Sequence, residues 1–267
     1  MSLTVTILGS GSSGGVPRPG AGWGACDPAE PKNRRLRCSI LVERRGPGGT
    51  TRVLVDTGPD LREQLIAAAV PALDGVLMTH DHADHTHGID DLRSLVLHMG
   101  RRIRVHADAR TQDSLRHRFG YLFETPPGSH YPPILDLDEI GAGRSVTIEG
   151  RGGPIEALPL RVEHGPNYEA LGFRFGALAY LPDVSLIPPA ALEALTDLDV
   201  LVLDCLREKP HVSHFHLAQS LEAVATLKPR RAILTNLHVD LDYASLSRRL
   251  PAGMEAAFDG MTIVTGD

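Results

Sequence analysis

A short turn crowded with histidine and aspartate constrains this chain more than any other stretch. Residues 78–88 read Met-Thr-His-Asp-His-Ala-Asp-His-Thr-His-Gly, and four side chains of metal-ligand type fall within six residues: His80, His82, Asp84 and His85. The apolar residues 74–78 before them predict a short buried strand, and residues 88–97 after them predict a helix. The sequence therefore places these side chains on a strand-to-helix turn.

Four ligand-type side chains on one tight turn favour a metal site with two ions. Zinc, manganese and iron all accept imidazole and carboxylate ligands. Four such groups cannot all reach one ion comfortably, and enzymes with two metals hold them about 3.5–4 Å apart to activate water. A single isolated histidine is more often a hydrogen-bonded surface or core residue. Imidazoles and charges this close together need a shared partner, which favours metal over the structural alternative.

The remaining composition is that of an ordinary soluble protein. Over 267 residues, 42% are hydrophobic and 22% charged, and the three cysteines are an odd number, which argues against a disulfide framework. No stretch approaches the roughly 18 apolar residues of a membrane span, and no basic segment precedes the first apolar run. The expectation is a cytoplasmic protein without a membrane partner. A net charge of -6 gives no strong nucleic-acid footprint.

Strand and helix patterns recur in both halves of the chain. Strands are predicted at 3–8, 38–43, 51–56, 102–106, 154–163, 171–175, 177–182, 199–204 and 231–236. Helices are predicted at 61–69, 89–99, 108–118, 188–195, 217–224 and 242–250, and residues 254–264 suggest a final hairpin. No linker divides the halves, so residues 1–267 are expected to form one domain with paired sheets between helical layers.

Two segments near the start have no regular pattern. The glycine-rich residues 9–15 lack the Lys-Ser/Thr ending of a phosphate-binding P-loop, so a flexible bend is the favoured interpretation. Residues 16–37 are rich in Gly, Pro, Arg and Asn and predict a long surface loop. Loops of that length are often functional.

The turn at residues 80–85 resembles the signature of the metallo-β-lactamase fold, and the resemblance extends over nearly the whole chain. Within that fold, the chain resembles the PhnP-like cyclic phosphodiesterases and, more distantly, tRNase Z. The features shared with them are the start Leu-Thr-Val-Thr-Ile-Leu-Gly-Ser-Gly, Cys38-Ser after an Arg-rich loop, His214 before an amphipathic helix, and the ending around Phe258-Asp-Gly-Met. The resemblance implies an α/β fold, an αββα sandwich of two mixed β-sheets flanked by helices.

The same resemblance implies a set of metal ligands. It assigns His80, His82 and His164 to one ion, and Asp84, His85 and a last histidine to the other, with Asp183 between them. Asp56, in Asp-Thr-Gly, corresponds to the aspartate that contacts the ligands rather than the metal. Two divalent ions, zinc or manganese and alternatively iron, are the implied cofactors.

Two departures from the PhnP-like pattern affect this ligand set. Those proteins carry Thr-His after the last strand, whereas this chain has Thr235-Asn236, with His238 two residues later. Positions two apart lie on the same side of an extended segment, so His238 is predicted to be the last ligand. A structural zinc in the first loop is predicted to be absent, because Cys26 stands alone there and Val239 occupies the position of the zinc-binding histidine.

The resemblance also suggests residues that act on the substrate. His214 is the expected general acid, and Asp84 is predicted to be catalytic as well as a metal ligand. His211 and His216 are nearby rivals, and a purely structural role for all three is the alternative. Arg207 and Arg93 are candidates for gripping a phosphate, with His216 as a further substrate contact. A solvated or ion-paired arginine is the alternative for each.

The expected reaction is hydrolysis of a phosphodiester by a hydroxide bridging the two metals, with His214 protonating the leaving oxygen. The expected partner is a small cyclic phosphate or nucleotide-like phosphodiester, and dimers among relatives suggest a homodimer. Three alternatives remain: tRNase Z-like RNA processing, thioester or lactone hydrolysis on the same scaffold, and a non-catalytic nucleotide-binding protein.

Overall fold

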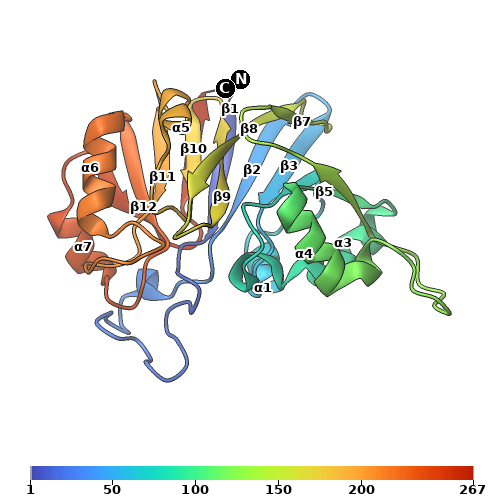
Figure 1. The fold of residues 1–267 in the computed structure, drawn as a ribbon, viewed down its shortest axis with the longest axis horizontal. Coiled ribbons are helices and arrows are strands. Elements are labelled where there is room, and N and C mark those ends of the chain that lie inside the picture. The colour runs from blue at the N-terminus through green and yellow to red at the C-terminus, as the bar shows by residue number, and fades with distance from the viewer. Residues whose placement is uncertain (1, 267) are drawn as a thin grey trace.

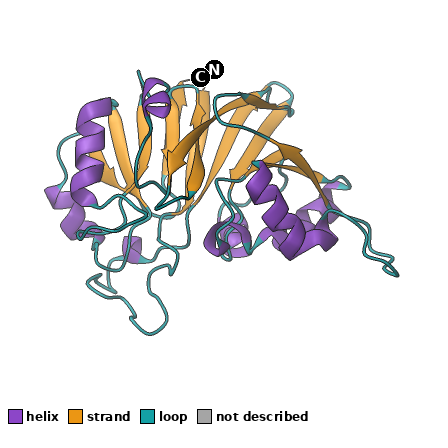
Figure 2. Ribbon diagram, viewed as in Figure 1, coloured by secondary structure: helices purple, strands orange, loops and turns teal. Residues whose placement is uncertain are grey.

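Two seven-stranded β-sheets pack face to face in the computed structural model, which describes residues 2–266 (Figures 1 and 2). The first sheet has the order β14-β1-β2-β3-β4-β5-β6. Its strands are β1 (Ser2–Gly9), β2 (Ser39–Gly46), β3 (Gly49–Val55), β4 (Gly75–Leu77), β5 (Ile103–Ala107), β6 (Leu135–Glu139) and β14 (Thr262–Gly266). The second sheet has the order β13-β12-β11-β10-β9-β8-β7. Its strands are β7 (Val146–Ile148), β8 (Ile155–Glu163), β9 (Glu169–Phe175), β10 (Leu178–Leu181), β11 (Val200–Asp204), β12 (Arg231–Thr235) and β13 (Met254–Ala256).

Helices cover the outer face of each sheet (Figures 1 and 2). The α-helices are α1 (Leu61–Ala67), α2 (Ala83–Thr86), α3 (Leu92–Met99), α4 (Ala109–Phe119), α5 (Pro189–Glu193), α6 (Leu217–Leu227) and α7 (Tyr243–Arg249). Short 3-10 helices are η1 (Pro31–Asn33), η2 (Ile89–Asp91) and η3 (Gly120–Leu122). None of the helices within residues 2–266 has the length and apolar character needed to cross a membrane.

Strand alternation divides the apolar residues between the sheet interface and the outer layers. Ile40 and Val42 of β2 belong to the core between the sheets, whereas Leu41 packs with the helices α1, α3 and α4. Val202 of β11 likewise faces the other sheet, and Leu201 packs toward α5. Successive residues of a strand point to opposite faces, so sheets buried on both sides read as continuous apolar runs. The predicted αββα sandwich is confirmed.

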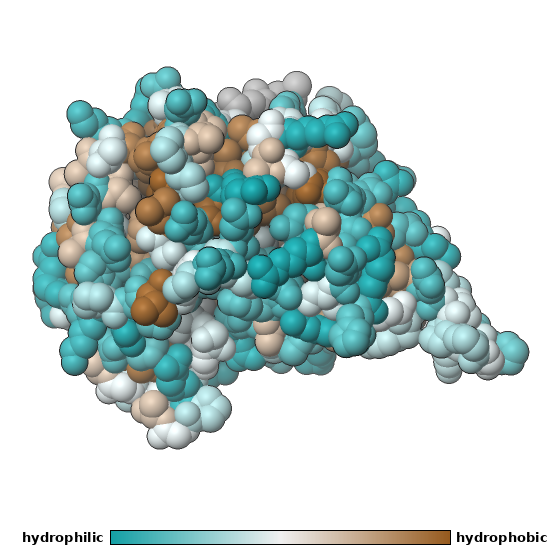
Figure 3. Space-filling view, viewed as in Figure 1, coloured by the Kyte–Doolittle hydropathy of each residue, from teal (hydrophilic) through white to brown (hydrophobic). Residues whose placement is uncertain are grey.

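Much of the visible surface is hydrophilic. Figure 3 shows hydrophilic residues over most of this face, with hydrophobic residues gathered in its upper part, over the sheets. The predicted helices and strands correspond to observed elements, with one exception at the end of the chain.

The predicted hairpin over residues 254–264 is wrong. β13 pairs in parallel with β12 in the second sheet, whereas β14 pairs antiparallel with β1 in the first. The segment between them crosses from one sheet to the other, and Asp259 within it accepts hydrogen bonds from the backbone N–H groups of Ser10 and Leu36 (2.9 and 2.7 Å). These tertiary bonds connect it to the opposite sheet, so the two strands do not pair with each other.

The long first loop lies at one edge of the sandwich. Residues 10–38 form the blue loop that hangs below the sheets in Figure 1. Gly11 forms isolated bridges with Arg37 and Leu237, which fix the glycine-rich turn beside the segment that follows β12. The carboxyl ends of β3, β4, β10, β11 and β12 reach the same edge, so their following residues meet there.

Candidate metal centre

The histidine-rich turn joins β4 to α2. β4 is central in the first sheet, between the parallel strands β3 and β5. His80 and His82 follow its carboxyl end, and α2 carries Asp84 and His85. His80 and His85 are each 1% exposed, so two imidazoles are buried within one turn. Buried polar groups of this kind require partners.

The second sheet supplies the remaining side chains. His164 follows β8 and Asp183 follows β10, and both are 3% exposed. Three groups of candidate ligands have ligand atoms within 4.8 Å of one another: His80, His82 and His164; His80, His85 and Asp183; and His164, Asp183 and His214. Residues separated by more than 100 positions thus converge where the two sheets meet.

Hydrogen bonds fix the orientation of the buried imidazoles. His85 Nδ1 lies 2.7 Å from Asp56 Oδ2, and His164 Nδ1 lies 2.7 Å from the carbonyl oxygen of Ser213. His80 Nδ1 lies 2.9 Å from Thr79 Oγ1, which itself donates to Asp56. In each ring Nδ1 therefore donates outward and Nε2 faces the centre, which is the orientation of metal-binding histidines.

The centre fits a cation. His85 Nε2 lies 3.1 Å from Asp183 Oδ2 and 3.4 Å from Asp84 Oδ2. Burial would lower the pKa of His85, but the Asp183, Asp84 and Asp56 carboxylates around it raise that pKa well above its usual value, so without a metal Nε2 carries a proton that faces Asp183. Within residues 2–266, the buried His80 Nε2 has no hydrogen-bond partner. The buried carboxylates favour a positive charge beside them, which a metal ion could supply in place of the His85 proton, and imidazole and carboxylate suit divalent zinc, manganese or iron.

The electrostatics of the buried groups are strongly coupled. Burial, together with neighbouring His85, holds the pKa of His80 well below its usual value. Burial would raise the pKa of the Asp183 carboxyl, but His85 beside it holds that pKa well below the usual value. The centre thus favours neutral His80 and ionised Asp183, which are the protonation states that metal binding requires.

His214 is held at the edge of this centre by a buried carboxylate. Its Nδ1 lies 2.8 Å from Oδ2 of Asp204, the last residue of β11, and the backbone N–H of Val184 donates to the same oxygen. Burial alone would lower the pKa of His214, but the Asp204 carboxylate raises it to about 9. Because Nδ1 is engaged by Asp204, Nε2 remains as the nitrogen that can serve a ligand.

A cavity of about 300 Å³ opens onto the centre. His82, Asp84, His164, Asp183 and His214 line one part of it. The other part is lined by side chains from the first loop and from the segments after β11 and β12: Ser12, Ser13, Arg18, Arg207, His211 and His238. The volume lies at the lower end of the roughly 300–1,000 Å³ typical of small-molecule sites.

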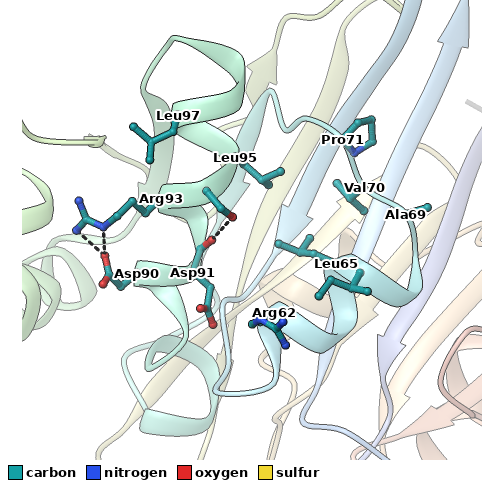
Figure 4. A pocket seen from close by; sticks show the side chains of 12 residues that line it. Arg62, Leu65, Ala69, Val70, Pro71, Asp90, Asp91, Arg93, Leu95 and Leu97 are labelled. Carbon is teal, nitrogen blue, oxygen red and sulfur yellow. Dashed lines mark hydrogen bonds and ion pairs between the residues drawn. The ribbon is translucent and has the colours of Figure 1, made fainter.

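The residues predicted to contact phosphate lie in different parts of the molecule. Arg207 lines the cavity, and its guanidinium donates to the carbonyl oxygens of Lys209 and Pro210. Arg93 instead lines a groove of about 570 Å³ between α1 and α3 and is ion-paired with Asp90 at 2.7 Å (Figure 4). His216 precedes α6 and caps its first turn together with Gln219. Of the three, only Arg207 lies beside the metal ligands.

His238 lies apart from the three ligand groups found within residues 2–266. Its Nε2 is 2.6 Å from Arg18 Nη1, and its Nδ1 is 3.1 Å from Asp240 Oδ2. Asn236 is instead the residue beside the centre, with Nδ2 3.3 Å from Asp183 Oδ1. The segment after β12 thus brings Asn236 to the ligands and His238 to the first loop.

Cys26 and Val239 pack against each other near the first loop. Both belong to a small apolar cluster with Val16, and Trp23 packs against it. Cys26 Sγ also contacts the carbonyl oxygen of Val239 at 3.4 Å.

Two residues of the site escape sequence reasoning. Tyr168 stacks on His82 with ring centroids 4.6 Å apart and donates to Asp81, so it packs against an exposed candidate ligand. Arg18 reaches the cavity from the middle of the irregular loop. In the sequence, the only signals for these two residues are that Tyr168 lies close to His164 and that the loop containing Arg18 is long.

A comparison with known proteins finds relatives over most of the chain. Residues 51–236 match the family model of the beta-lactamase superfamily domain. A curated octanoyltransferase from Porphyromonas gingivalis is 32% identical over 263 residues, covering 97% of this chain and 51% of that protein. The chain therefore spans about half the length of that relative.

Solved structures share the fold along the whole chain. A diphosphatase from the PhnP family is 36% identical with a TM-score of 0.88, covering 99% of this chain and 98% of the other. Zn²⁺-bound PqqB from Methylobacterium extorquens is 19% identical with a TM-score of 0.75, covering 97% and 99%. The short form of human tRNase Z is 17% identical with a TM-score of 0.65, covering 97% and 98%. The last two likenesses show the fold alone.

Proposed function

Because the chain belongs to the β-lactamase superfamily and is a hydrolase of the metallo-β-lactamase fold, we propose that it is a phosphodiesterase with a dinuclear metal centre. The proposed substrate is a small cyclic phosphate or nucleotide-like phosphodiester. The observation that carries the proposal is the position of His214, which shares a cavity of about 300 Å³ with the candidate metal ligands. A diphosphatase among the structural neighbours supports cleavage of a P–O bond.

The candidate ligands divide into two sets around Asp183. His80, His82 and His164 would hold one divalent ion, and Asp84 and His85 the other, with Asp183 between them. Zinc, manganese or iron would supply Lewis-acid stabilisation of phosphoryl oxygens and a water of lowered pKa. Zn²⁺-bound PqqB supports zinc as one candidate.

His214 acts on the leaving group in this proposal. Asp204 fixes the Nδ1 tautomer and keeps Nε2 directed away from the β11 carboxylate. A histidine so held can donate a proton from Nε2 to the departing oxygen. Asp84 brings negative charge to the same cavity, which favours a cation rather than the substrate phosphate beside it.

The character of the cavity favours a polar substrate. Among the described residues that line it, Leu206 is the only aliphatic one. An eight-carbon acyl chain, as an octanoyl substrate would bring, needs an extended apolar surface. The cavity therefore gives no support to transfer of octanoyl groups, whatever the longer Porphyromonas gingivalis relative does.

The test compares leaving groups on wild type and His214→Ala. With a cyclic nucleotide, whose leaving alkoxide needs a proton, turnover is expected to fall about 10²–10⁴-fold in the variant. With bis(p-nitrophenyl) phosphate, whose leaving group is stable without a proton, the loss should be much smaller. His98→Ala, at an exposed position on α3, is the matched control. Full turnover of the cyclic substrate by His214→Ala would exclude the acid role, and purified protein without stoichiometric metal would exclude the dinuclear centre.

A further inference from the structure

The glycine-rich turn and the first loop bring an arginine to the mouth of the metal cavity. Arg18 lines the cavity together with Ser12 and the metal ligands. The loop is anchored on both sides of it, since the backbone groups of Val16 and Arg35 exchange two hydrogen bonds of 2.9 Å. A Cβ placed on Gly14 would lie 2.5 Å from Arg18 Nη2, so the guanidinium packs closely over this glycine. The chain therefore builds a defined place for this side chain.

Arg18 has neutral partners. Its Nη1 lies 2.6 Å from His238 Nε2, and its Nη2 lies 3.4 Å from Ser12 Oγ. Its Nε is buried without a hydrogen-bond partner among residues 2–266, and no carboxylate in that range forms an ion pair with it. A guanidinium has five donors and no acceptor, so Arg18 retains unused donors and an uncompensated charge.

His238 and Asp240 hold the guanidinium in place. Arginine can only donate, so His238 Nε2 must be the acceptor, and the neutral ring then carries its proton on Nδ1. That nitrogen lies 3.1 Å from Asp240 Oδ2, which is the expected acceptor for it. The backbone N–H of Asp240 also lies 3.3 Å from Nδ1, but a proton on Nδ1 favours the shorter contact with the Asp240 carboxylate, so both nitrogens of His238 are used.

The same cavity is lined by acidic and by basic groups. Asp84 and Asp183 lie among the proposed metal ligands, whereas Arg18 and Arg207 have no acidic partner among residues 2–266. Arginine binds phosphoryl oxygens through charge-assisted hydrogen bonds of fixed geometry. We infer that Arg18, positioned by His238 and Asp240, binds a second phosphoryl oxyanion of the substrate, next to the one that reacts. This inference rests on the proposed phosphoester chemistry and names its substrate class: esters with two adjacent phosphoryl groups.

Binding without turnover tests the subsite independently of the reaction. Methylenediphosphonate carries two linked phosphoryl groups and methylphosphonate carries one, and neither has a cleavable ester. Calorimetric titration of the metal-loaded protein should show tighter binding of the diphosphonate to wild type. Arg18→Ala should weaken diphosphonate binding about 10–100-fold and methylphosphonate binding less than about 3-fold, because one charge-assisted contact is lost. Arg18→Lys should recover part of the affinity through its charge.

Arg34→Ala is the matched control, since Arg34 is an exposed arginine of the same loop. Equal weakening of both probes by Arg18→Ala would overturn the inference, as would no weakening or no preference for the diphosphonate in wild type. If Arg18 selects the diphosphonate but no phosphoester is hydrolysed, the subsite stands and the proposed function fails. If cyclic nucleotides are hydrolysed and Arg18→Ala binds both probes normally, the proposed function stands and the subsite fails.

Metal content tests the role of His238. His238→Ala should weaken diphosphonate binding about 3–10-fold, because Arg18 loses its positioning partner, and it should retain the metal content of wild type. His164→Ala, in contrast, should lose metal, since His164 belongs to two of the candidate ligand groups. Equal metal loss in His238→Ala and His164→Ala would make His238 a ligand and remove it as the positioning residue.

Discussion

At the scale of single residues, the centre depends on groups that form hydrogen bonds with the outward-facing nitrogens of its histidines. Asp56 is fully buried and accepts from His85 Nδ1, from the Thr79 backbone N–H and from Thr79 Oγ1, at 2.7, 2.8 and 2.8 Å. Through these bonds one carboxylate orients His85 directly and His80 through Thr79. The charge of Asp56 also raises the electron density of the His85 ring, which strengthens it as a ligand.

Replacing Asp56 by Asn should therefore weaken metal binding. We expect zinc affinity to fall about 10–100-fold in Asp56→Asn, as for other partners of metal-binding histidines. Competition with a chelating dye measures this affinity. Asp138→Asn is the matched control, because Asp138 stands 3.9 Å from His106 in a histidine–aspartate pair away from the centre. Unchanged zinc affinity in Asp56→Asn would show that Asp56 is only structural.

Sequence reasoning at this scale identified candidate ligands that are local in the chain and was limited where contacts are distant. His80, His82, Asp84 and His85 are neighbours in the chain, and their convergence follows from a single turn. The prediction for His238 assumed that the chain stays extended after β12, so that side chains two positions apart point the same way. The backbone after β12 leaves that conformation at Asn236, where φ is +62°, so residues 236 and 238 reach different partners.

At the scale of elements, close backbone contacts position α2 against the end of β3. Thr57 donates from its backbone N–H to the His85 carbonyl at 2.8 Å, and Gly88 donates to the Thr57 carbonyl at 2.8 Å. A Cβ on Gly58 would lie 2.2 Å from the Asp84 carbonyl oxygen. Glycine is thus required for the segment to approach the helix that carries two candidate ligands.

Gly58→Ala should displace α2 and affect both stability and metal binding. We expect a loss of about 1–3 kcal/mol in the free energy of unfolding, as for other overpacked sites, and weaker zinc binding. Gly141→Ala is the control, since a Cβ there meets no atom within 4 Å. Denaturant titration and dye competition measure the two effects. Zinc affinity equal to wild type in Gly58→Ala would show that α2 does not need this close approach.

The failure of the predicted final hairpin also belongs to this scale. Two short alternating segments separated by Asp259-Gly260 have the local pattern of a hairpin, and that pattern carries no information about the partner of each strand. Register is chosen by distant residues, here Ala232 to Leu234 of β12 for one strand and Ser2 to Thr6 of β1 for the other. By contrast, the β2–β3 hairpin was predictable because its strands pair with each other across a short glycine-rich turn.

At the scale of the whole molecule, the candidate metal centre joins the two sheets. His80 and His85 come from the end of the first sheet and His164 and Asp183 from the second, so bound metal would cross-link the halves at one edge. Without a metal, a protonated His85 facing Asp183 is a single such link, and the buried Nε2 of His80 has no hydrogen-bond partner within residues 2–266. Metal binding and folding should therefore be thermodynamically linked across the molecule.

Removing the metal should accordingly lower the melting temperature. A ligand present at about 1,000 times its dissociation constant contributes about 4 kcal/mol, which corresponds to a shift on the order of 10 °C for a protein of this size. Scanning calorimetry of the metal-loaded protein with and without a chelator measures the shift. His164→Ala should melt at a temperature that the chelator no longer changes, whereas exposed His98→Ala should respond like wild type. A melting temperature of the loaded wild type that is insensitive to the chelator would contradict the linkage, because a cation shared by both sheets cannot leave without loosening the edge at which they meet.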